Sequence, residues 1–143
     1  MTTVRQLLEG KSPEVFEVRP DAAVIDAIRL MAEKGIGAVL VMDQGHLVGI
    51  LSERDYARKI VLHDRSSRST QVRDIMTAQV ITVAPAQQVE HCLQLVTDHR
   101  IRHLPVVDES GVIGVISIGD LVKSVIDDQA QKLDQLQQYI VAG

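Results

Sequence analysis

The chain has 143 residues, of which 45% are apolar and 24% charged, with a net charge of −4 at neutral pH. These values are typical of a globular protein and exclude a low-complexity or disordered chain. The acidic balance, two Tyr, one Phe and no Trp make nucleic-acid binding an unfavoured function, because basic grooves and stacking platforms are lacking. No apolar stretch approaches the ~20 residues of a membrane span, and no secretory signal is visible. We therefore expect a cytoplasmic protein that does not contact membranes.

The first half of the chain predicts five elements in the order β-α-β-β-α. They are a strand at Val15–Val18, a helix around Val24–Met31, strands at Ala38–Met42 and Leu47–Leu51, and a helix that opens at Ser52. Apolar residues spaced by four and three indicate the first helix. The Asp- and Gly-containing segment between the last two strands predicts an antiparallel hairpin.

The second half repeats this pattern at an offset of 65 residues. Ten positions of residues 18–55 are identical in residues 83–120, including Pro20 and Pro85, Gly49 and Gly114, and the Ser and Asp that follow each hairpin. The repeat predicts strands at Val80–Val83, Leu104–Val107 and Val112–Ile116, and helices around Val89–Val96 and after Ser117. A lead-in, residues 4–8, resembles residues 72–76 at an offset of 68. The fold class is thus α/β (α+β), with two pseudo-symmetric repeats.

The expected domain boundaries follow from this repeat. They are a first repeat with its lead-in at residues 1–64, a linker at 65–71, a second repeat at 72–128 and a C-terminal helix at 129–143. The polar, aperiodic stretch His63–Thr70 indicates the linker. Leu133, Leu136 and Ile140 form an apolar stripe on the last helix. This stripe packs either on its own domain or on another subunit.

Each repeat ends in a Ser-x-x-Asp motif, Ser52 to Asp55 and Ser117 to Asp120. One interpretation is structural, because Ser at a helix N-cap and an acidic residue three positions later satisfy the free N–H groups of the first turn. The other is functional, because the carboxylate can accept hydrogen bonds from ribose hydroxyls, while Ser and the free N–H groups suit a phosphate or ribose oxygen. The two interpretations are compatible.

These residues resemble a tandem CBS (cystathionine β-synthase) domain pair, the Bateman module. The resemblance rests on the doubled segments Gly49–Asp55 and Gly114–Asp120, on Leu104–Asp108 and on the lead-in Val72–Thr77, and it covers residues 4–126. It implies two repeats packed sheet to sheet, with two clefts that bind adenosine compounds. AMP, ADP or ATP are the leading ligands, and NAD or S-adenosylmethionine the alternatives. Leu40 replaces the Pro105 of the second repeat, which makes the two clefts unequal.

The candidate ligand-binding residues come from the motifs and their counterparts. They are Ala38, Ser52, Arg54, Asp55, Thr70, Met76, Arg102, His103, Pro105, Ser117 and Asp120. Arg102 and His103 stand where the first repeat has Gly37 and Ala38, so they are either a phosphate clamp or a solvated basic loop. Arg54 could reach a phosphate or be an exposed helix residue.

Catalysis finds little support in the sequence. The lone Cys92 lies on an apolar helix face and predicts a buried thiol, and neither metal-ligand spacing nor a nucleophile motif occurs. We therefore expect no enzyme but a regulatory sensor that couples occupancy to an unknown regulated protein or to its own assembly. The alternative is a ligand-independent scaffold of the same fold. The resemblance also implies a homodimer, with contacts through Tyr56, Ile60 and Val61 and through the C-terminal stripe.

Overall fold

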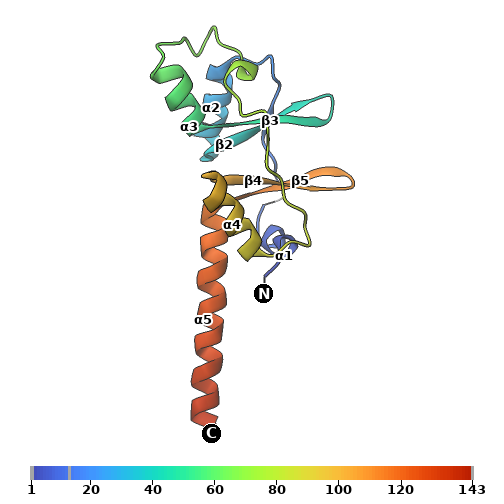
Figure 1. Cartoon of the computed structure of the whole chain (residues 1–143), viewed down its shortest axis with the longest axis vertical. Helices are drawn as coiled ribbons and strands as arrows, with labels where there is room; N and C mark the ends of the chain where they lie inside the picture. Colours follow the sequence, from blue (N-terminus) through green and yellow to red (C-terminus); the bar gives the residue numbers. More distant parts are fainter. Residues whose placement is uncertain (1, 13, 143) are drawn as a thin grey trace. The chain divides into compact units, whose positions relative to one another are not determined.

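The computed structural model in Figure 1 describes residues 2–12 and 14–142. It contains two compact units, which we name the central unit (Val15–Ile81) and the terminal unit (Met1–Glu14 with Thr82–Gly143). This division differs from the expected one, because the N-terminal lead-in joins the second repeat and residues 72–81 join the first. Each repeat is thus completed by a lead-in that precedes the other repeat in the sequence.

The central unit contains a three-stranded sheet in the order β1-β2-β3. Its elements are β1 (Glu17–Val18), α2 (Val24–Lys34), β2 (Ala38–Asp43), β3 (His46–Ser52), α3 (Glu53–Tyr56), the π-helix η1 (Ala57–Val61) and the 3₁₀-helix η2 (Val72–Asp74). The terminal unit contains α1 (Val4–Glu9), α4 (Val89–His99), β4 (His103–Asp108), β5 (Gly111–Ser117) and α5 (Ile118–Ala142), with β4 and β5 as a two-stranded sheet. The predicted hairpins and helices of both repeats are confirmed.

Equivalent backbone hydrogen bonds attach the two lead-ins. In the central unit the Val72 N–H donates to Ala22 O at 2.8 Å, and the Val24 N–H donates to Thr70 O at 2.9 Å. The matching bonds of the terminal unit are Val4 N–H to Gln87 O at 2.8 Å and Val89 N–H to Thr2 O at 3.0 Å. Neither α2 nor α4 has a side-chain N-cap. The lead-in carbonyls therefore satisfy the first N–H groups of these helices.

The predicted strand Val80–Val83 does not form, whereas its counterpart in the first repeat does. Val83 makes only an isolated parallel bridge to Val106, while β1 pairs with β2 as a strand. The Leu40 N–H donates to Phe16 O at 3.1 Å, and its counterpart Pro105 has no N–H to donate. The replacement of Leu40 by Pro105 thus leaves the second sheet with two strands instead of three.

In each unit a lead-in side chain packs directly over a glycine of the hairpin. A Cβ at Gly49 would lie 2.5 Å from Met76 Sδ, and a Cβ at Gly114 would lie 2.7 Å from Leu8 Cδ2. Met76 also packs against the central core, which includes the fully buried Leu51.

Cys92 is a free, buried thiol, as predicted, and burial raises its pKa. A raised pKa leaves less of the thiol in the nucleophilic thiolate form at neutral pH.

The terminal helix α5 is continuous from Ile118 to Ala142 and so extends across the expected boundary between residues 128 and 129. Its stripe does not pack on its own unit, since Leu133, Leu136 and Ile140 are 62%, 57% and 73% exposed. Figure 1 shows this distal part of α5 extending past α4. The expectation that Ile60 takes part in a dimer contact is wrong, because this side chain is buried in the central core and only 2% exposed.

Candidate functional site

In the central unit the Ser-x-x-Asp motif closes the first turn of α3. The Ser52 N–H and hydroxyl both donate to Asp55 Oδ2 at 3.0 Å, and the Asp55 N–H donates to Ser52 Oγ at 3.1 Å. The other oxygen, Oδ1, lies 3.4 Å from Thr77 Oγ1 and 3.5 Å from Lys59 Nζ. The predicted capping box is present, and it occupies one of the two carboxylate oxygens.

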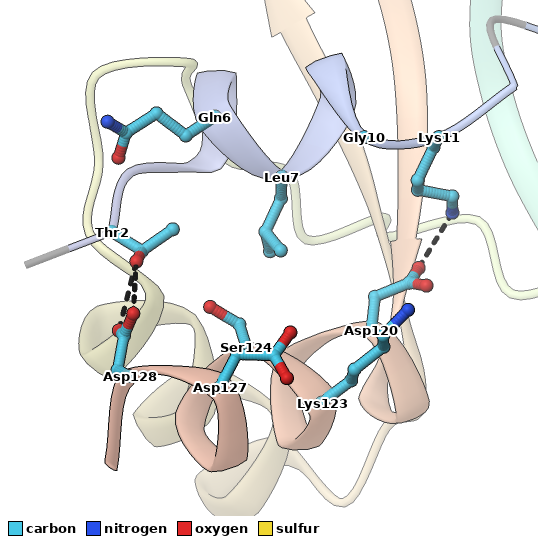
Figure 2. A pocket seen from close by; sticks show the side chains of 10 residues that line it. All are labelled: Thr2, Gln6, Leu7, Gly10, Lys11, Asp120, Lys123, Ser124, Asp127 and Asp128. Atoms are coloured by element: carbon cyan, nitrogen blue, oxygen red, sulfur yellow. Dashed lines mark hydrogen bonds and ion pairs between the residues drawn. The ribbon is translucent and has the colours of Figure 1, made fainter. Parts of the chain in front are cut away.

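In the terminal unit the same motif starts α5 with different partners. The Ser117 N–H donates to Asp120 Oδ2 at 2.8 Å, and the Asp120 N–H donates to Ser117 Oγ at 3.2 Å. Lys11 Nζ lies 2.7 Å from the same Oδ2 and donates to Val115 O at 2.6 Å. Figure 2 shows the Lys11 side chain reaching Asp120 from the segment after α1. The hydrogen bonds from Ser117 and Lys11 thus converge on Asp120 Oδ2.

The charge state of Asp120 results from opposing effects. Partial burial raises the pKa of this carboxyl, but hydrogen bonds from Lys11 and Ser117 and the positive charge of Lys11 together bring the pKa below its usual value of 3.8. Asp120 is therefore ionised at neutral pH. An ionised carboxylate accepts hydrogen bonds from neutral hydroxyl groups more strongly than a neutral acceptor does.

The backbone before the second strand of each repeat lies at the start of the motif helix. The Ile118 N–H donates to Arg102 O at 2.8 Å, and the equivalent Glu53 N–H donates to Gly37 O at 3.0 Å. In the hairpins, His103 pairs with Ser117 and Ala38 pairs with Ser52. The structure therefore brings Arg102 and His103 to the Ser117 motif and Ala38 to the Ser52 motif. Arg102 is exposed, and its counterpart Gly37 offers no charge at the equivalent place.

Three other predicted ligand residues have evident structural roles. Pro105 is buried in β4, where its carbonyl accepts the Val83 N–H at 3.0 Å. Thr70 places its carbonyl at the start of α2, and Met76 covers Gly49. Arg54 lies in the first turn of α3, next to Asp55 in the sequence, and has partners of its own.

The sequence interpretation missed the two lysines that hold the motif carboxylates. Lys59 follows Asp55 by four residues, a helical spacing that could have indicated the contact. Lys11 is 109 residues from Asp120, and no local pattern connects them. Only the attachment of the N-terminal lead-in to the terminal unit places this ammonium beside the second motif.

A pocket of about 300 Å³ lies between α1 and α5 in the terminal unit (Figure 2). Lys11 and Asp120 line one end, and the other end has Thr2, whose hydroxyl lies 2.9 Å from Asp128 Oδ2. Ser124 also lines this pocket, and its counterpart in the central unit is Lys59. Of the predicted ligand residues, Asp120 is the one among its lining residues.

Within residues 2–12 and 14–142, no group of three or more His, Cys, Asp or Glu side chains is placed to hold a metal ion. The same part of the chain contains no helix long and apolar enough to cross a membrane.

The doubled hairpin and the paired Ser-x-x-Asp helices define a CBS-domain pair. A family model described as "CBS domain" matches residues 4–62 and 72–127, and the chain belongs to this family. The CBS pair is a regulatory module. The two matched segments correspond to the two repeats of the sequence, although their lead-ins are exchanged between the compact units.

Known proteins similar to the chain carry the same pair. A CBS-domain protein from Burkholderia ambifaria MC40-6, whose structure is solved, is 56% identical with a TM-score of 0.86, over 90% of this chain and 96% of that one. The "CBS domain-containing protein CBSX3, mitochondrial" of Arabidopsis thaliana is 45% identical, over 99% of this chain and 73% of the relative.

A more distant likeness concerns a structure with ligands. The CBS domain pair of protein MJ0100, in complex with 5′-methylthioadenosine and S-adenosyl-L-methionine, is 22% identical with a TM-score of 0.77. The match covers 89% of this chain and 98% of that one. At this identity the likeness shows a common fold.

Proposed function

We propose that this protein is a regulatory sensor that binds an adenosine nucleotide at its Ser-x-x-Asp motifs. The observation that carries the proposal is the environment of Asp120, an ionised carboxylate at the start of a 25-residue helix. The backbone of Arg102 is bonded to that same helix start. A ribose hydroxyl can donate to the carboxylate, and a phosphate can pair with the guanidinium.

The adenosine ligands of the MJ0100 domain pair support this class of ligand. AMP, ADP and ATP are the ligands that we propose first, because Arg102 offers a forked donor to a phosphate. NAD and S-adenosylmethionine are the alternatives, and the latter brings a cation instead of a phosphate.

The second candidate function is a ligand-independent scaffold. It is favoured by the two capping boxes, which account for the Ser and Asp of each motif through bonds within the protein alone. Both candidates agree with a homodimer or with a separate regulated partner. The cytoplasmic location expected from the sequence stays a prediction.

Thermal denaturation with added nucleotides separates the two functions. A sensor is stabilised by AMP, ADP or ATP, by about 2.7 kcal/mol at a hundredfold excess over Kd, and not by GMP or CMP. Native mass spectrometry of gently purified protein gives a second readout, since a retained adenosine mass supports the sensor. No stabilisation by any adenosine compound, together with a ligand-free mass, would favour the scaffold.

Variants of the two motifs test the role of the carboxylates. We expect Asp120→Ala to reduce the AMP-induced shift more than Asp55→Ala, because Arg102 and His103 belong to the repeat of Asp120. Asp98→Ala, an exposed residue on α4, is the matched control. If Asp120→Ala and Asp55→Ala only lower the ligand-free stability, by the ~1 kcal/mol of a lost cap, the ribose role is wrong.

A further inference from the structure

The distal half of α5 carries an apolar stripe with heptad spacing. Ile126, Gln129, Leu133, Leu136 and Ile140 follow one another at intervals of three, four, three and four residues. This is the spacing of the a and d positions of a coiled coil, with Ile126, Leu133 and Ile140 at a and Gln129 and Leu136 at d. An amphipathic helix with this repeat keeps its apolar seam on one side.

The unit that contains α5 leaves this seam uncovered. Ile126, Leu133, Leu136 and Ile140 are 59%, 62%, 57% and 73% exposed. By contrast, Leu121 and Ser124 in the first half of the same helix are buried, at 0% and 6% exposed. A helical segment of some fifteen residues is marginal in water unless its apolar face is packed. The distal half of α5 therefore requires a partner.

We propose that the partner is the distal α5 of a second copy, in a parallel two-stranded coiled coil. Ile126 and Ile140 at a, with Leu136 at d, follow the pattern that favours two parallel strands. Gln129, the polar residue of the seam, favours the parallel over the antiparallel orientation of the two helices. In a parallel, in-register pair Gln129 meets the second copy's Gln129, so the two amides bond to each other. An antiparallel pair that aligns the same seam places Gln129 against Ile140 and leaves the amide unpaired, which is unfavourable.

The charges beside the seam suit a pair of identical helices. The flanking e and g positions are Val125, Ala130, Lys132, Gln137 and Tyr139. The one charge among them, on Lys132, faces the neutral Gln137 of the second copy in the parallel register, so like charges do not oppose each other. The carboxylates lie at outer positions, at Asp127, Asp128 and Asp134.

This coiled coil goes beyond the proposed sensor function and does not depend on it. Pairing through α5 fixes two copies around an axis that runs along the helix, whether or not the motifs bind a nucleotide. The test therefore uses the full chain without nucleotide, so its failure leaves the ligand proposal untouched.

Two neighbouring substitutions test the seam. Leu136→Glu places a carboxylate in the seam, and Gln135→Glu places the same charge on the outer face of the same turn. We expect Leu136→Glu to weaken self-association in sedimentation equilibrium by at least about tenfold, and Gln135→Glu to leave it unchanged. Circular dichroism melts check that both variants keep the fold of the globular units. Equal association of the two variants overturns the proposal, even if the protein remains a dimer through another surface.

Cross-linking tests the orientation. Cys92 is buried, so a new thiol at the helix surface reports on its own neighbours. We expect Ile140→Cys to give a disulfide-linked dimer under mild oxidation, because parallel pairing brings the two a positions together. Gln138→Cys, at an outer position of the same turn, is the control and stays unlinked. A failure of Ile140→Cys to link, or equal linking of both variants, overturns the parallel coiled coil.

Discussion

The two units repeat one capping motif but surround its carboxylate differently. Asp55 is approached by Lys59 at 3.5 Å, from the same helical segment, whereas Asp120 is held at 2.7 Å by Lys11, from the N-terminal lead-in. The cap depends on residues three apart, so duplication copies it intact. The counter-ion depends on which segment packs nearby, and it has diverged. Two sites with the same motif thus differ in the distance of the counter-ion and in the segment that supplies it.

The largest difference that we expect between the sites concerns phosphate. Arg102→Ala should weaken AMP binding by about tenfold to a hundredfold and leave adenosine binding nearly unchanged, because a charged hydrogen bond is worth about 1.5–3 kcal/mol. Gly37, at the equivalent position of the central unit, cannot compensate. Calorimetry with AMP and adenosine measures both affinities.

The control for this substitution is Arg68→Ala, which removes an exposed Arg elsewhere in the chain and should change neither affinity. Equal losses for AMP and adenosine in Arg102→Ala would mean that Arg102 maintains the shape of the site and does not bind phosphate.

The next largest difference between the units should be in the free energy of unfolding lost when the glycine under each lead-in is replaced by alanine. Gly49→Ala should destabilise the protein by about 2 kcal/mol and Gly114→Ala by about 1 kcal/mol. At Gly49 the new Cβ would meet Met76 Sδ at 2.5 Å and the backbone Thr77 O at 3.1 Å, whereas at Gly114 it meets only the movable end of Leu8. Denaturation in urea gives both values. Gly10→Ala, whose nearest neighbour is 3.7 Å away, is the control, and a larger cost at Gly114 would contradict the prediction.

The Lys11 contact should produce a pH-dependent stability of about 1 kcal/mol. The folded-state pKa of Asp120 is lowered, so the contact stabilises the protein above the usual carboxyl value of 3.8 and the stabilisation is lost as pH falls through the folded pKa. Lys11→Met should therefore be less stable than the wild type at neutral pH, and the difference should shrink below about pH 4. Urea unfolding across this pH range tests the effect. A difference that is constant with pH would assign the loss to packing of the Lys11 stem.

Of the four predicted effects, the one at the Lys59–Asp55 ion pair should be the smallest. Lys59→Met should lose no more than about 0.5 kcal/mol of ion-pair stabilisation, because the ammonium is 3.5 Å from Asp55 Oδ1 on a side chain that is 42% exposed. Like Lys11→Met, it also removes a hydrogen bond to a backbone carbonyl, here Ile75 O at 2.9 Å, so the two variants differ mainly in the ion pair. The same unfolding series, run beside Lys11→Met, gives the comparison. A cost at Lys59 equal to that at Lys11 would show that the two motifs have equivalent counter-ions.

Much of the fold and part of the site followed from the sequence. The repeat of 65 residues predicted the two hairpins, the four main helices and both Ser-x-x-Asp turns, because each depends on residues close together in the chain. The absence of the strand expected at Val80–Val83 could have been predicted from Pro105, because proline has no N–H to donate to a neighbouring strand. The buried side of Ile60 could not, since the π-helix from Ala57 to Val61 changes the periodicity after α3.

Alternation, helical spacing and capping residues act within a few positions, so local patterns were enough to predict most strands, helices and caps. Contacts between distant segments were not predictable in this way: they join each lead-in to the other repeat, bring Lys11 to Asp120 across 109 positions and leave the distal stripe of α5 exposed. The two lead-ins are similar in sequence, so their local patterns do not indicate which repeat each of them packs against. That choice depends on packing between distant segments, where buried area and backbone bonds to α2 and α4 select the arrangement.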